Sequence, residues 1–378
     1  MKHTILVAVA VVACTLIASV QASAVEWATV GARAAGMGGA GVAVTTDAYA
    51  TYWNPAGLAM SKTIVIRMGL SAQAIDRVGI KDTIDEIKGF NTNDPSQANI
   101  NKANDIANRI NRPGASLSAI GAAGLYVKGY FGEHAFGFNL SDVATAGMFV
   151  SSPVRVTPGP GSVSLSGQMA LNGLEARQAV FSYAYAFMDR MFSFGVSGKV
   201  IQGAAYTGTA TIQGGNDVSL SDNLGKARLS TAFGIDVGAM YRPSSWLRVG
   251  IVAKDINQPT FDTQAGGQFK LNPQVRGGVA VNPWETLTVT MDADVTSNKT
   301  LVPDIKSRVI SLGAEQTIFS ELLSLRLGAF KNIADANSHI TPTAGFGVRL
   351  FALRVDVGGG YDFRERGVLA SGTVALTF

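Results

Sequence analysis

Beyond residue 62, apolar and polar positions alternate with a period of two through most of the chain. Leu247, Val249 and Ile251 alternate with polar or small residues, and Leu323 and Leu325 begin another run of the same kind. Successive side chains of a β-strand point to opposite faces, so this pattern predicts strands with one apolar and one polar face. Charged residues recur well inside these runs, which indicates that the polar face borders water or other polar groups.

The alternation predicts fourteen strands, most of them near or above the roughly nine to eleven residues that a tilted strand needs to cross a membrane. The predicted strands are 63–71, 119–131, 134–142, 177–188, 191–204, 226–242, 246–254, 273–281, 286–297, 306–317, 321–331, 340–349, 352–363 and 367–378. An even number of strands places both ends of the chain on the same side.

The connections between these strands fall into two classes of length. Even-numbered connections are tight, around 132–133, 189–190, 243–245, 282–285, 319–320 and 350–351. Most odd-numbered connections are long and cover 72–118, 143–176, 205–225, 255–272, 298–305 and 332–339. Short turns at one end and long loops at the other are typical of outer-membrane barrels. The sequence therefore predicts an all-β protein of the outer membrane: a 14-stranded antiparallel transmembrane β-barrel over 63–378. Outer-membrane lipid and lipopolysaccharide would surround it, with the long loops outside and both termini in the periplasm.

The first 24 residues have the composition of a signal peptide. Lys2 supplies a positive start, residues 5–20 are apolar, and small residues up to Ala24 form a cleavage site. Cys14 follows a short apolar stretch, so a lipoprotein signal is the alternative. Because Cys14 is the only cysteine, the mature chain cannot rely on disulfides for stability.

The composition of the chain excludes several other classes of protein. It is 47% apolar and only 15% charged, which is less charge than a secreted soluble enzyme usually carries and fits a lipid-facing surface. After the signal, no run of 18 apolar residues predicts a membrane helix. The net charge of +4 comes without a Lys/Arg-rich tract, so we expect no nucleic-acid partner.

The first long loop, 72–118, has a helical pattern. Ile100, Ala103, Ile106 and Ile110 are spaced three or four residues apart between polar residues. We expect an outward helix or helical pair in this loop. It would either cap the pore and offer apolar surface to a ligand, or pack on the loop between strands three and four.

Residues 25–62 do not alternate and are rich in small residues, which predicts a hatch folded into the barrel lumen. Its motif residues are Gly36, Gly38, Gly39, Asp47, Asn54, Pro55, Ala56 and Gly57. Glycine lets backbone segments pack closely, proline stops a helix or ladder, and asparagine holds a turn.

These motif residues, in this order, resemble the start of FadL/TodX-type outer-membrane transport proteins, a superfamily with PorV-like and TraF-like barrel branches. The resemblance implies fourteen strands and a hatch that ends at an Asn-Pro-Ala motif just before strand one. It also implies that a ligand is captured outside, that the hatch shifts, and that the ligand leaves sideways where strand three bends inward. Gly137 is the candidate for that kink.

Catalytic and cofactor sites are hard to assemble from this sequence. Residues 36–41 fit the nucleotide-binding pattern GxGxxG, but the required strand, helix and downstream acid are missing. His3 leaves with the signal peptide, and the predicted topology separates His134 from His339 at opposite ends of the barrel. We therefore expect no enzyme, no metal site and no cofactor.

Charged residues on the predicted lumen face include four arginines, Arg67, Arg248, Arg326 and Arg354. They would either form ion pairs between the wall and the hatch or guide an anionic amphiphile, and the sequence leaves both open.

Two functions follow from these observations. The first is an outer-membrane channel for uptake of a hydrophobic small-molecule ligand, such as a long-chain fatty acid or hydrocarbon. The second is a PorV/TraF-like barrel that binds an envelope or secreted protein partner, or assembles such complexes. An open gap beside strand three with an apolar tunnel would favour the first function, and a sealed wall the second.

Overall fold

A computed structural model describes residues 26–215, 219–220, 227–264 and 266–378 of the chain. The predicted signal peptide and its cleavage site lie outside the described residues. Among these residues, no helix is both long and apolar enough to cross a membrane.

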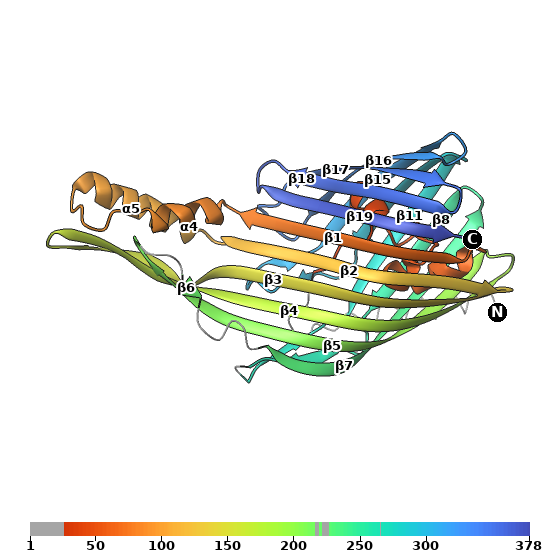
Figure 1. Cartoon of the computed structure of the whole chain (residues 1–378), viewed down its shortest axis with the longest axis horizontal. Helices are drawn as coiled ribbons and strands as arrows, with labels where there is room; N and C mark the ends of the chain where they lie inside the picture. Colours follow the sequence, from red (N-terminus) through yellow and green to blue (C-terminus); the bar gives the residue numbers. More distant parts are fainter. Residues whose placement is uncertain (1–25, 216–218, 221–226, 265) are drawn as a thin grey trace.

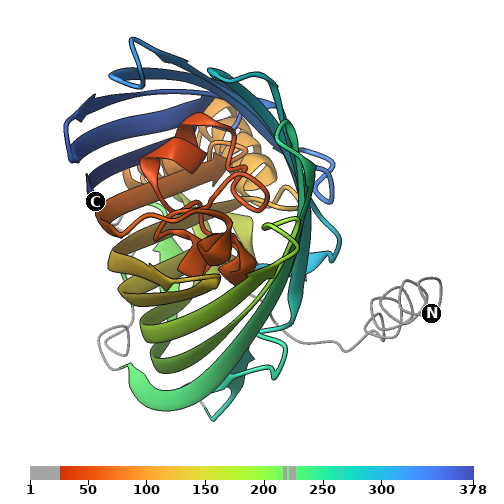
Figure 2. The same ribbon diagram turned by 90° about the vertical axis from the view of Figure 1, so that its right-hand side faces the viewer.

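Fourteen of the strands in the described residues close into one antiparallel barrel, as the alternation predicts (Figures 1 and 2). The ring runs from β1 to β19 through neighbouring hairpins and closes where β19 pairs with β1. Its strands are β1 (Val65–Arg77), β2 (Ser116–Phe131), β3 (His134–Gly159), β4 (Ser162–Phe187), β5 (Phe192–Gln213), β7 (Arg228–Ser244), β8 (Leu247–Lys254), β11 (Gln274–Trp284), β12 (Leu287–Asp294), β15 (Val309–Ile318), β16 (Leu323–Asn332), β17 (Thr341–Leu350), β18 (Leu353–Asp362) and β19 (Gly367–Thr377). Five short strands lie outside the ring: β6 (Ser219–Leu220), β9 (Thr260–Asp262), β10 (Gln268–Lys270), β13 (Asn298–Lys299) and β14 (Lys306–Ser307).

The two faces of the wall have opposite polarity. Large apolar side chains are exposed on the outside, such as Met68 at 64% and Leu327 at 68%. Their neighbours along the strands, Arg67 and Arg326, are buried in the lumen. This is the reverse of a water-soluble barrel, where apolar residues fill the interior.

One predicted loop is wrong. Residues 143–176 form the distal parts of β3 and β4, which are 26 residues long each and turn only at 160–161. β2 pairs with β3 as far as Phe149, so beyond that residue the β3–β4 hairpin leaves the ring. The segment contains Pro153 and Pro158, but proline is tolerated on an edge strand, and this edge of β3 has no partner strand there.

Two helices, α4 (Ile80–Lys88) and α5 (Gln97–Ile110), fill the first connection and pack on this extended hairpin (Figure 1). Their apolar faces share a buried cluster with the inner faces of β3, β4 and β5. Its members include Ile80, Ile87, Ile106, Ile110, Val154, Val163, Leu165 and Ile212. The helix prediction and its packing alternative are thus confirmed. We call α4, α5 and residues 150–169 of the hairpin the projecting arm.

Residues 26–62 lie inside the barrel (Figure 2). They form α2 (Ala32–Gly36), α3 (Ala50–Trp53) and the 3₁₀ helix η1 (Pro55–Met60). α2 packs on β17, β18 and β19, and η1 packs on β4, β5 and β7. Nearly every side chain of the segment is buried.

The segment crosses the lumen from end to end. Glu26 lies beside Arg77 at the end of β1, at the long-loop end of the barrel. Ile64 and Phe378 exchange backbone hydrogen bonds of 3.1 and 2.8 Å at the short-turn end. The barrel's two ends therefore meet as predicted, but the first described residue lies at the opposite end from the C-terminus. The prediction of both termini on one side does not hold for this part of the segment, because its backbone runs back through the lumen before β1.

Candidate functional site: the segment inside the barrel

Glycines let the segment approach the wall at backbone distance. Gly38 has a φ of +69° and donates its N–H to the Thr343 hydroxyl at 2.9 Å. A Cβ at Gly38 would overlap the carbonyl oxygens of Ala329 and Leu312. The predicted glycines behave alike: Gly36 faces Gly345, Gly39 also has a positive φ of +80°, and a Cβ on Gly57 would meet the Thr45 carbonyl oxygen.

Asn54 and Pro55 form the turn that begins η1. The Asn54 side chain is fully buried, and its Oδ1 accepts the N–H of Ala56 at 3.1 Å. Its Nδ2 donates to the carbonyl oxygens of Val42 and Ala239, both at 3.3 Å. Ala239 belongs to β7, so one side chain holds the turn, the segment and the wall together.

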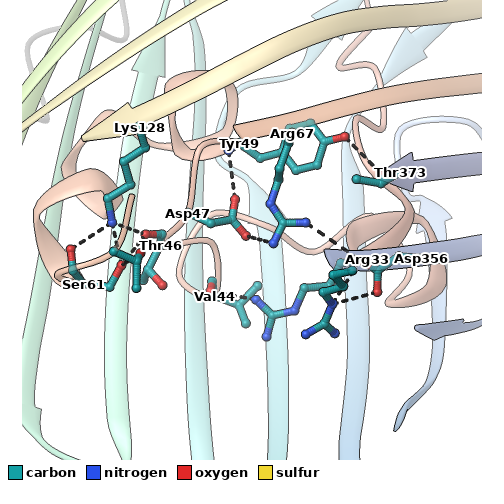
Figure 3. A network of polar contacts seen from close by, with 12 residues as sticks. Arg33, Val44, Thr46, Asp47, Tyr49, Ser61, Arg67, Lys128, Asp356 and Thr373 are labelled. Atoms are coloured by element: carbon teal, nitrogen blue, oxygen red, sulfur yellow. Dashed lines mark hydrogen bonds and ion pairs between the residues drawn. The ribbon is translucent and has the colours of Figure 1, made fainter. Parts of the chain in front are cut away.

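An ion-pair network joins the segment to the wall (Figure 3). Asp47 of the segment pairs with Arg67 of β1 at 2.9 Å. Arg33 of α2 pairs with Glu315 of β15 at 2.6 Å and donates to the Val44 carbonyl oxygen. Each pair bridges segment and wall, so the ion-pairing role predicted for lumen charges is present at Arg67.

Two further predicted arginines belong to the same network. Arg326 pairs with Glu315 at 2.6 Å and with Asp356 at 2.7 Å, and Arg354 pairs with Asp356 at 3.1 Å. Buried charges are costly unless they are paired and hydrogen-bonded, so this wiring is specific to one position of the segment. Arg248 is the exception among the four, since no ion pair joins it to any described residue.

Lys128 anchors the far end of the segment. Its ammonium is buried and donates to the carbonyl oxygens of Thr46 and Ser61 at 2.8 and 2.9 Å, and to the Ser61 hydroxyl at 2.5 Å (Figure 3). These are charge-assisted hydrogen bonds, which are stronger than neutral ones.

Trp27 was not singled out from the sequence, yet it lies in the lumen toward the long-loop end. Lys254 of β8 lies 4.4 Å and the Arg276 guanidinium of β11 4.5 Å from its ring, and Trp53 stacks on it at 6.1 Å. These cation–π contacts come from strands far along the chain, so no local pattern could have revealed them. Beside Trp27, burial raises the pKa of Glu26, although the nearby Arg77 opposes the shift.

The lumen retains little open space around this segment. Two cavities among the described residues, each of about 70 Å³, adjoin Glu26 and Trp27. Each has charged side chains in its lining, Arg77 and Asp335 in one and Lys199 and Asp236 in the other. An apolar cavity that binds benzene has a volume of about 150 Å³, so neither cavity is an apolar binding chamber.

The wall at Gly137 is continuous. Gly137 is paired with Lys128 of β2 on one side and with Ser182 of β4 on the other, without a shift in register near it. The structure therefore does not show the predicted kink. A Cβ on Gly137 would instead overlap Thr51 and come within 3.0 Å of Leu58, so this glycine admits the N-terminal segment.

The two described histidines lie at opposite ends of the barrel. His134 contacts the Tyr183 hydroxyl at 2.8 Å at the start of β3, next to a short turn. His339 contacts Arg364 at 3.1 Å at the long-loop end. Their separation agrees with the predicted topology.

Solved structures of similar fold include proteins described as toluene transporters and a FadL homologue. The Ralstonia pickettii toluene transporter TbuX is 14% identical with a TM-score of 0.55, over 92% of this chain and 97% of that one. The Pseudomonas putida toluene transporter TodX is 12% identical with a TM-score of 0.53, over 93% and 98%. A Pseudomonas aeruginosa FadL homologue is 11% identical with a TM-score of 0.56, over 94% and 99%. At these identities, the similarity is one of fold.

The family described as "F plasmid transfer operon, TraF, protein" matches residues 51–294, which is more than half of the sequence. The chain belongs to this family. A search of curated proteins finds no match.

Proposed function

We propose that this protein is an outer-membrane barrel that binds or assembles an envelope or secreted protein, and that its projecting arm makes the contact. The observation that carries the proposal is the combination of a continuous wall and a filled lumen. Within the described residues, every neighbouring pair of the fourteen barrel strands is hydrogen-bonded, and the N-terminal segment is wired across the interior. A barrel built in this way serves better as a platform than as a passage.

Membrane placement in this proposal rests on the outer surface. Exposed apolar side chains cover the outside of the wall, and aromatic rings gather at the short-turn end. Among these rings are Phe187, Phe192, Tyr241, Trp246, Trp284 and Phe351. Aromatic belts favour the membrane interface, and short turns face the periplasm in such barrels. The arm would then stand outside the cell.

The arm is rigid and its strand edge is closed. The buried cluster between α4, α5 and the hairpin gives it a core of its own. On the free edge of β3, the Asn111 side chain exchanges two hydrogen bonds of 2.8 Å with the backbone of Val154. Asn111 therefore imitates a strand partner, and Pro153 and Pro158 blunt the rest of the edge. Binding would use the polar helix faces rather than added strands.

Site-specific photo-crosslinking in intact cells tests the proposal. A crosslinker placed at exposed Asn101 or Asn104 of α5 should yield one discrete protein adduct. The same group at exposed Lys331 of β16, across the ring from β3 and β4, should yield none. Deleting 79–113 should abolish the adduct formed from a crosslinker on the hairpin at Gln168. Absence of an adduct from every arm position would rule the proposal out.

Uptake of hydrophobic small molecules is the second candidate, favoured by the fold shared with TbuX and TodX. It requires the segment to shift and the wall to open, since the two cavities beside Trp27 are each only about 70 Å³. Binding of labelled oleate or toluene to purified protein tests it. Saturable binding that raises the free energy of unfolding would support uptake, and its absence for every apolar ligand would exclude it.

Neither candidate assigns catalysis to this chain. With its histidines at opposite ends, the barrel offers no triad around both. We propose that it acts without a cofactor and without nucleic acid.

A further inference from the structure

Two arginines lie on adjacent strands at the short-turn end of the lumen, beneath the N-terminal segment. Met240 of β7 pairs with Gly250 of β8, and both contact the segment, Gly250 through the Asn54 side chain. Arg242 is two residues from Met240, and Arg248 is two residues from Gly250. Each is therefore the next inward-facing position toward the short turn at 245–246. They are therefore neighbours at the rim of the lumen, just below the closed part.

No carboxylate among the described residues forms an ion pair with either of them. The Arg242 side chain donates only to the backbone oxygen of Asp189, at 3.4 Å. The Arg248 guanidinium is repelled by both Arg242 and Arg33, and Arg33 is already engaged by Glu315 at 2.6 Å.

The rest of the lumen shows how unusual this is. Arg67, Arg276 and Arg326 each have a carboxylate partner within 3 Å. Like charges on adjacent strands destabilise a sheet. An unpaired arginine pair at a lumen mouth is therefore best stabilised by an anion from outside the chain.

We propose that Arg242 and Arg248, with Arg33 behind them, bind a carboxylate-rich segment of a periplasmic protein. The inference rests on the proposed function, which places the short-turn end in the periplasm. Guanidinium groups bind carboxylates through two parallel hydrogen bonds, which makes acidic side chains the matching ligand.

The surroundings favour a peptide over a fatty acid. The N-terminal segment closes the lumen directly behind the site, so the ligand has to be presented from the mouth. Met240, Ala280 and Thr290, which adjoin the arginines on neighbouring strands, are at most 1% exposed. An alkyl chain would find no open apolar surface beside them, whereas an acidic segment needs only the guanidinium groups.

Fluorescence anisotropy with a labelled, end-blocked tetraglutamate peptide tests the site on the full-length protein in a non-ionic detergent. The double variant R242Q/R248Q should bind the peptide about tenfold more weakly, or worse, than the unchanged protein. The double variant K306Q/K331Q removes the same charge from exposed positions at the long-loop end, outside the arm, and should bind as the unchanged protein does. Circular dichroism establishes that both variants are folded.

Equal affinity in the two double variants would overturn the proposal, as would a failure of the unchanged protein to bind the peptide saturably. A parallel titration with oleate separates the two ligand sources. If oleate binds more tightly than the peptide and R242Q/R248Q loses that binding, the ligand is an anionic lipid and the peptide assignment is wrong. The crosslinking test of the arm is independent of all these outcomes.

Discussion

At the scale of single residues, the packing inside the lumen depends on glycines that no larger residue can replace. It also depends on charged side chains whose partners lie far away in the sequence. Gly38 lies so close to carbonyl groups of the wall that any Cβ would overlap them. Lys128 uses its three donors on two residues of the segment. Both residues join the segment to the wall. Their substitution should therefore affect the placement of the segment before it affects the barrel.

Gly137→Ala should destabilise the protein by about 1–3 kcal/mol, because the added methyl group overlaps Thr51 and presses on Leu58. Gly129→Ala on β2 is the matched control, since a Cβ there meets no atom within 4 Å. Urea unfolding in detergent, followed by tryptophan fluorescence, measures both free energies of unfolding. Equal stability of the two variants would show that the segment does not pack on Gly137.

Glu365, in the turn between β18 and β19, should make stability depend on pH. Burial raises its pKa from 4.5 to about 7; Arg77 opposes the shift, and Asp335 and Asp362 add to it. The folded state thus binds the proton more tightly, so this contribution is complete below about pH 4.5 and is lost as the pH rises through 7. From about pH 4 to pH 8, the unfolding free energy should fall by about 1 kcal/mol relative to Glu365→Gln, after allowance for solvent screening. Parallel pH profiles for the two proteins would contradict this.

At the scale of elements, the arm is a small unit with its own core on a barrel that does not need it. Its sheet exposes one polar face and covers the other with α4 and α5, as expected for an amphipathic layer pair. The barrel strands beneath have complete ladders without it. The arm should therefore unfold separately from the barrel.

Ile106→Asp should disorder the arm and leave the barrel folded, because it places a charge in a fully buried position of α5. We expect a loss of about 3 kcal/mol or more in the arm's local stability. Hydrogen exchange should show faster exchange confined to α4, α5 and the hairpin beyond Phe149. Asn104→Asp, on the exposed face of the same helix, is the control and should exchange as the unchanged protein does.

At the scale of the whole molecule, we expect the closed wall and the ion pairs that hold the segment inside it to restrict passage of solutes. The two cavities of about 70 Å³ both adjoin Trp27, which Lys254 and Arg276 contact, so we expect little passage of solute past this ring. Vesicles containing the protein should accordingly not swell in isotonic arabinose, whereas vesicles with an open porin should. Swelling at a comparable rate would show that the segment leaves the lumen readily and would favour the uptake candidate.

Much of this architecture was determined by the sequence alone. Period-two alternation is a local property, so it predicted all fourteen barrel strands, and helical spacing predicted α5 in the same way. The parity of turn lengths predicted a barrel, and the small residues before Asn54 and Pro55 predicted an internal segment.

Only the tertiary structure decided the rest. Whether 143–176 is loop or strand depended on which edge its prolines lie on, and that is settled by the partner of β3. Arg67 pairs with Asp47 of the N-terminal segment, and Arg326 pairs with Asp356 of β18, so both partners are set by how the segment and the strands are arranged in space. The direction of residues 26–62 through the lumen is equally non-local. Alternation along a strand specifies whether a side chain points into or out of the barrel. Which residues an inward-facing side chain contacts is determined only when the strands close into the ring.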